Sequence, residues 1–277
     1  MPESYVNVNG LKICYEINGN GYPVLLVHAL GNKKERWIAQ VPVLSKKYKV
    51  ISFDNRGAGK SERPDLPYTM DMYADDIKGL LDSLKIEKAH IIGSALGGMI
   101  AISFTLKYSS MVNKLILINT PTDIPDENGV EMLKKSALEE LERLKIDPKD
   151  AFWQKVRINY HRDFRKQLQQ YPDKKFYGLW SVQDIIREKV TNPPRPQDIQ
   201  NQIHAIKNFK SLERLKEIKN NTLLIASSHS RLHPKSVMLE MRKRIPNSVV
   251  KVIEKAGDNV ELSRAPEINQ LIIEFLS

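Results

Sequence analysis

Short apolar runs alternate with amphipathic stretches over the first 120 residues of the chain. Four runs are rich in branched aliphatic side chains and end at Gly, Asn, Asp or Pro, as buried strands do; they cover 24–27, 50–53, 89–92 and 114–118. Between them, 72–84 carries apolar residues at helical spacing, and 98–108 follows a glycine-containing turn into a second helix. This alternation predicts an α/β fold with a doubly wound, mostly parallel sheet.

The pattern changes near Pro121 and changes back near Asn221. The intervening segment is long, charged and helical, with a proline-rich break at 192–196. A buried strand is expected again at 222–226, followed by a helix, a further strand at 249–253 and a final helix over 266–276. We therefore expect one core built from residues 1–123 and 213–277, with residues 124–212 as a helical cap over the C-terminal edge of the sheet, where such folds bind ligands. The alternative is that the insertion forms an independent helical domain.

Composition narrows the class of protein without identifying it. The 277 residues include 41% hydrophobic and 27% charged side chains, which is ordinary for a globular protein large enough to bury a core. One cysteine, Cys14, excludes a disulfide framework and indicates a reducing, cytoplasmic location. The amino-terminal residues lack the pattern of a secretory signal, and the longest uncharged stretch, 91–106, is too short to span a bilayer.

The net charge of +10 raises the question of a polyanionic partner. The excess is spread over the core and the insertion in short doublets such as Lys134-Lys135 and Lys174-Lys175, without interleaved aromatic residues. We therefore expect a solvated basic surface and no nucleic-acid or membrane partner. The sequence leaves open whether the chain forms a homodimer.

Three motifs occur in a characteristic order. Leu25-Leu26-Val27-His28-Ala29-Leu30 ends the first buried strand, Asp54-Asn55-Arg56-Gly57-Ala58-Gly59-Lys60-Ser61 follows the second, and Gly93-Ser94-Ala95-Leu96-Gly97-Gly98 follows the third. Together they resemble the α/β-hydrolase family, of the capped, esterase-like type, over essentially the whole chain. In that family the third motif is the turn that exposes a catalytic serine at the centre of G-x-S-x-G.

The resemblance implies that the Ser-Asp-His triad positions are Ala95, Ser230 and Asp258. None of the three residues can take the usual role, because alanine has no nucleophilic atom, a serine hydroxyl supplies no charge, and an aspartate replaces the imidazole base. Loss of the triad of a serine protease lowers its turnover by ~10⁶. Drift in a lineage released from catalytic demand, or an engineered redesign of an active esterase, explains three substitutions better than a simple knock-out.

Other residues near these positions are candidates for a remaining function. The resemblance implies that the backbone N–H groups of Leu30 and Leu96 form an oxyanion hole. His28 is a candidate acid/base or ligand contact, and Ser94 a candidate displaced nucleophile. No metal-ligand spacing is present, and no cofactor is expected.

Two functional hypotheses follow. In the first, the chain has lost serine-hydrolase catalysis and retains a pocket for a small organic ligand. In the second, it is a hydrolase or lyase-like enzyme that uses a rearranged set of Asp258, His28 and the oxyanion hole. Kinship of fold does not choose between them.

Overall fold

A computed structural model describes residues 3–124 and 126–277. Its strands, in chain order, are β1 (Ser4–Val8), β2 (Leu11–Asn18), β3 (Pro23–Val27), β4 (Lys49–Phe53), β5 (Ala89–Ser94), β6 (Val112–Ile118), β7 (Asn221–Ser227) and β8 (Ser248–Ile253). Within the described part of the chain they form one sheet in the order β1-β2-β4-β3-β5-β6-β7-β8. Pairing is antiparallel where β2 meets β1 and β4, and parallel elsewhere. The expected fold class is confirmed.

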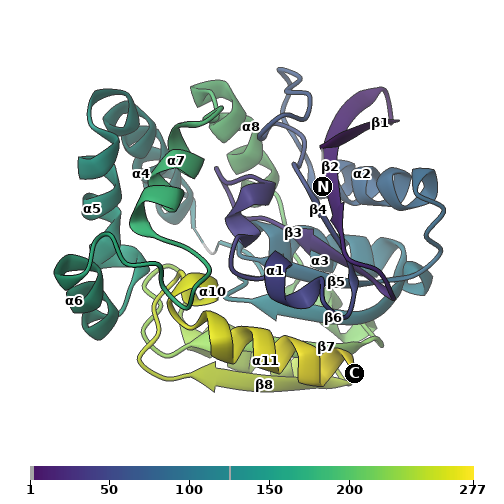
Figure 1. Cartoon of the computed structure of the whole chain (residues 1–277). Coiled ribbons are helices and arrows are strands. Elements are labelled where there is room, and N and C mark those ends of the chain that lie inside the picture. Colours follow the sequence, from purple (N-terminus) through teal and green to yellow (C-terminus); the bar gives the residue numbers. More distant parts are fainter. Residues whose placement is uncertain (1–2, 125) are drawn as a thin grey trace.

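Helices cover both faces of this sheet (Figure 1). They are α1 (Val41–Leu44), α2 (Met70–Ser83), α3 (Leu96–Lys107), α9 (Lys235–Arg244), α10 (Val260–Ser263) and α11 (Ala265–Leu276), with 3₁₀ turns η1 (Lys34–Trp37), η2 (Ser109–Met111) and η3 (Leu212–Glu217). Side chains of α2, α3 and α9 share one hydrophobic cluster with the sheet, whereas α1 and α11 contribute to the cluster on the opposite face. This is the doubly wound arrangement that the sequence predicts.

Five α-helices lie between β6 and β7 in the described part of the chain, and we refer to them as the inserted helices. They are α4 (Glu127–Ile146), α5 (Pro148–Asn159), α6 (Arg162–Gln170), α7 (Val182–Val190) and α8 (Pro196–Lys207). Figure 1 shows α4 to α7 beyond the end of the sheet toward which the arrowheads of β6 and β8 point. They therefore face the C-terminal ends of the parallel strands. Met1, Pro2 and Pro125, which fall in the segments expected as core and cap, lie outside the described residues.

The inserted helices are attached to the rest of the molecule on two sides. On one side, the Gln202 side chain of α8 accepts a hydrogen bond from the backbone N–H of Gly31 (3.2 Å) and donates to the carbonyl of Gly57 (3.0 Å). On the other side, Trp180 Nε1 donates to the carbonyl of Leu262 (3.1 Å), and Tyr177 Oη to that of Ser263 (2.6 Å). These bonds tie the inserted segment to the loops that follow β3 and β4 on one side and to α10 on the other.

Candidate active site

The turn between β5 and α3 has the backbone of a nucleophile elbow. Ala95 has φ of 49° and ψ of −115°, a conformation that L-residues rarely adopt. The turn needs its glycines because neighbouring backbone is very close: a Cβ on Gly93 would lie 2.3 Å from the Gly97 carbonyl oxygen, and a Cβ on Gly97 would lie 2.0 Å from that of Val27. The elbow is therefore complete in its backbone, with a methyl group at its tip.

Two backbone donors, one directly after Ala95 in the chain and one in the loop after β3, have no protein acceptor within the described part of the chain. Among the described residues, neither the N–H of Leu30 nor that of Leu96 donates to a protein acceptor. Leu96 is the first residue of α3, where N–H groups have no partner within the helix and the helix dipole favours negative charge. Ala29, Leu30 and Ala95 are each half-buried, so the strand ends beneath the inserted helices keep accessible surface.

Ser230 and Asp258 are in direct contact, although 28 residues separate them. The Ser230 hydroxyl donates to Asp258 Oδ1, and this carboxylate also accepts from the backbone N–H groups of Arg231 (3.0 Å) and Leu232 (3.2 Å). Ser230 Oγ in turn accepts from the N–H of His233 (2.8 Å). The pair holds the loop after β7 against the loop after β8. The Ser230 hydroxyl and both carboxylate oxygens of Asp258 are engaged in these hydrogen bonds.

Asn119 places this pair. Its side chain, 1% exposed at the end of β6, donates to Ser227 Oγ (2.9 Å) and to the carbonyl of Asp258 (3.1 Å), and it accepts from the N–H of Ser227 (2.9 Å). One amide thus joins the ends of β6 and β7 to the loop that carries Asp258. The sequence analysis did not single out Asn119.

His28 does not face the elbow as a free base. Its Nε2 accepts a hydrogen bond from the N–H of Asn55 (3.0 Å), which leaves the proton on Nδ1, 3.0 Å from the carbonyl oxygen of Ala29. Burial lowers the pKa of His28 and favours the neutral ring, in spite of the nearby charge of Asp54. Both ring nitrogens are therefore hydrogen-bonded to backbone groups of the loops after β3 and β4.

Of the two histidines beside Ser230, one is exposed and the other is not. His229 is exposed, and its ring lies 4.6 Å from that of His161. Burial lowers the pKa of His233, although Asp258 opposes the effect. Its Nδ1 is buried and has no partner among the described residues.

Ser94 points to a carboxyl group that the sequence analysis missed. The Ser94 hydroxyl donates to Oε1 of Glu261 in α10, and Glu261 Oε2 is buried without a partner among the described residues. Burial raises the pKa of Glu261, while Arg36 and Ser94 oppose the rise. The sequence indicates a role for Glu261 only by its closeness to Asp258, which it follows by three residues.

The motif from Asp54 to Ser61 forms a loop that is held by buried polar contacts of its own. Asp54 accepts hydrogen bonds from the N–H groups of Lys34 and Lys60, each at 2.8 Å. Arg56 makes a two-pronged ion pair with Asp76 of α2, at 2.6 and 2.7 Å. These buried contacts give the motif a structural explanation that requires no catalytic role.

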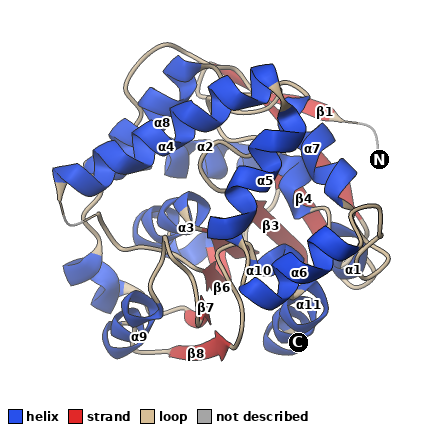
Figure 2. Ribbon diagram, turned by 90° about the vertical axis from the view of Figure 1, so that its left-hand side faces the viewer, coloured by secondary structure: helices blue, strands red, loops and turns tan. Residues whose placement is uncertain are grey.

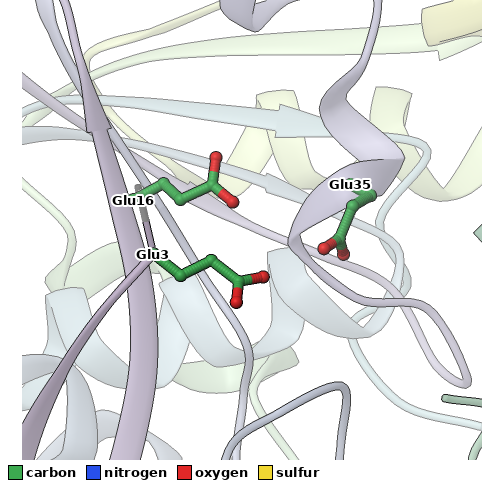
Figure 3. A group of neighbouring side chains, drawn as sticks. All are labelled: Glu3, Glu16 and Glu35. Atoms are coloured by element: carbon green, nitrogen blue, oxygen red, sulfur yellow. The ribbon is translucent and has the colours of Figure 1, made fainter. Parts of the chain in front are cut away.

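One group of carboxylates has the spacing of a metal site. Glu3, Glu16 and Glu35 converge (Figure 3). However, the ammonium group of Lys34 lies 2.9 Å, 3.6 Å and 2.7 Å from these three carboxylates, respectively. Burial lowers the pKa of Lys34, but Asp54, Glu35 and Glu3 raise it further, so the lysine stays charged and serves as their cation. The group is an internal ion-pair network.

Comparison with known proteins agrees with the fold and with the motifs. The family model of the alpha/beta hydrolase fold matches residues 22–264, and the chain belongs to that family. Among curated relatives, "Putative carbamate hydrolase RutD" of Caulobacter segnis is 25% identical, over 95% of this chain and 96% of that protein.

Solved structures are similar over nearly the full length. The enol-lactonase of Burkholderia xenovorans LB400 is 23% identical with a TM-score of 0.81, and covers 99% of both chains. A thermophilic esterase of Thermogutta terrifontis is 22% identical with a TM-score of 0.83, and the match covers 100% of this chain and 98% of that one. No described helix is long and apolar enough to cross a bilayer.

Proposed function

We propose that this α/β-hydrolase-family protein binds a small organic ligand between the sheet and the inserted helices and does not act as a serine hydrolase. The observation that carries the proposal is Ala95, which occupies the tip of a complete elbow without a nucleophilic atom. The free N–H groups of Leu30 and Leu96 support a site that still receives a carbonyl or carboxylate oxygen.

The contacts of the other triad positions support the same proposal. Asp258 accepts three hydrogen bonds from the loop after β7, and Ser230 is one of these donors. His28 has no free nitrogen with which to exchange a proton with a ligand. A rearranged enzyme that relies on Asp258 and His28 would have to break these bonds at each turnover.

The hydrolase half of the proposal is tested with a panel of nitrophenyl esters, a lactone and a carbamate, the last two chosen after the names of the similar proteins. We expect no turnover by the parent above that of an unrelated control protein. The variant A95S/S230D/D258H should gain measurable esterase activity, whereas each single change should not, because triad members act as a unit. Turnover by the parent above ~1 s⁻¹ would refute the proposal.

The binding half is tested with the same compounds, which the parent should leave intact. A ligand that binds only the folded state raises the melting temperature by mass action. Ala95→Leu, which adds bulk at the tip of the elbow, should remove any such shift, and Leu239→Gln on the exposed side of α9 should preserve it. A shift that is equal in the parent and in Ala95→Leu would place the ligand elsewhere and refute binding at the elbow.

A further inference from the structure

A cationic groove lies on α5 and α6, apart from the elbow. It is a hollow of about 730 Å³, lined by Lys149, Trp153, Val156, Arg157, Arg162, Arg165, Lys166, Gln169 and Pro172. Five of these nine residues are basic and none is acidic. Figure 2 looks directly onto α5 and α6, which form the outer surface of the inserted helices.

The basic residues of this groove lack the partners that other lysines of the inserted helices have. Lys155 and Lys189 both pair with Glu140, at 3.3 and 3.4 Å. By contrast, no carboxylate of the described residues lies within 4.0 Å of the charged groups of Lys149, Arg157, Arg165 or Lys166, and Arg162 meets only Asp163, at 3.5 Å. The groove therefore keeps a concentrated positive potential.

A second hollow extends the same positive surface. It measures about 710 Å³, shares Arg157, Arg162 and Arg165 with the first, and adds Arg231 and Lys255 against a single acidic residue, Glu254. The three shared arginines thus lie where the two hollows meet. Arginine is well suited to this position, since its planar guanidinium binds phosphate or carboxylate oxygens in pairs.

The apolar part of the groove indicates the rest of the ligand. Trp153 is half-buried beside Val156 and Pro172, and its ring lies 5.2 Å from that of Phe152, which holds it edge to face. A half-exposed indole can stack on a planar ring. The volume is that of a pocket for one small molecule.

From these observations we infer that the groove on α5 and α6 binds a small organic polyanion with a planar ring, of the class of a nucleoside triphosphate. The charged groups bind at Arg157, Arg162 and Arg165, and the ring packs on Trp153. This inference is independent of the proposed function, because neither Ala95 nor the loops beside it line the first hollow.

Calorimetric titration of the full chain with ATP tests the inference. Inorganic tripolyphosphate, which has the charge alone, and adenosine, which has the ring alone, separate the two contributions. Arg157→Gln/Arg165→Gln should weaken ATP binding by at least about tenfold, because two charge-assisted contacts are lost. Lys149→Gln/Lys166→Gln gives a second test if the arginine variant does not fold.

The matched control is Lys46→Gln/Lys47→Gln, which removes the same charge from two exposed, adjacent lysines outside the inserted helices. It should bind ATP as the parent does. Trp153→Ala should weaken binding of ATP and leave that of tripolyphosphate unchanged.

Three results would overturn the inference. The first is absence of ATP binding by the parent. The second is equal weakening by the control and by the arginine variant, which would indicate net charge alone. The third is tighter binding of a single-stranded oligonucleotide with the same dependence on Arg157 and Arg165, which would assign the groove to nucleic acid.

Discussion

Replacing Ala95 by glycine should stabilise the protein, although glycine at most positions in a folded chain does the reverse. Ala95 holds φ of 49° and ψ of −115° because the elbow forces it to, between β5 and the first turn of α3. Glycine adopts such a conformation without a Cβ clash. Because Ala95 has no nucleophilic atom, the strained backbone does not position a reactive side chain at this turn.

The size of the effect follows from three contributions. Strained backbone of this kind costs about 1–3 kcal/mol, which glycine would release. Against this, glycine gives the unfolded chain extra freedom worth about 0.5–1 kcal/mol. Loss of a methyl group that is only half-buried costs about 0.4 kcal/mol more. We expect a net stabilisation of about 1 kcal/mol, or roughly 2 °C in melting temperature for a chain of this length.

Urea denaturation of the parent and of Ala95→Gly measures this difference directly. The matched control is Ala101→Gly, at a fully buried position within α3, which should destabilise by about 1–2 kcal/mol. If Ala95→Gly were destabilised as much as the control, the elbow would not be strained, and the interpretation of the turn would be wrong.

Three further outcomes are expected. His90 is 3% exposed, and burial together with Lys114 lowers its pKa to about 4. The unfolded chain therefore binds a proton at His90 below pH ~6.5 while the folded protein does not, so the protein loses stability as the pH falls from ~6.5 toward 4. His90→Asn should remove about 1–2 kcal/mol of the stability loss between pH 7 and 5, and equal pH profiles of parent and variant would contradict this. Asn119→Ala should cost about 2–4 kcal/mol in denaturant unfolding, because it breaks three buried hydrogen bonds, and a cost below about 0.5 kcal/mol would refute its linking role. Asp258→Asn should lower the free energy of unfolding by about 1–3 kcal/mol and leave ligand-induced thermal shifts intact; unchanged stability would show that Asp258 does not hold the loop after β7 against the loop after β8.

The buried parallel strands could be predicted because each is encoded by a continuous run of apolar residues. The runs at 24–27, 50–53, 89–92 and 114–118 lie within β3, β4, β5 and β6, because strands buried on both faces are continuously hydrophobic. The hairpin of β1 and β2 escaped the prediction, since one face of each strand is partly exposed and the apolar runs are interrupted. Asn9-Gly10 was its signal, with positive φ at both residues of a two-residue turn.

The site was predictable only where a motif fixes the backbone. The glycines around Ala95 indicated the elbow, and the loops after β7 and β8 do bring Ser230 to Asp258. The roles of side chains were not predictable in the same way. The contact of Ser94 with Glu261 depends on how α10 packs under the elbow, and no local pattern encodes that packing.

The cationic groove shows why the distribution of charge along a chain is a poor guide to its distribution in space. The lysine doublets, conspicuous in the sequence, do not line the groove. Of its five basic residues, only Arg165 and Lys166 are adjacent in the sequence. Together with Arg162 they are spaced i, i+3 and i+4, which places all three on one side of α6. Trp153 and Arg157, also four residues apart, share a side of α5 in the same way. An aromatic ring is therefore interleaved with basic residues where the two helices pack together, although the lysine doublets of the sequence carry no interleaved aromatic residue.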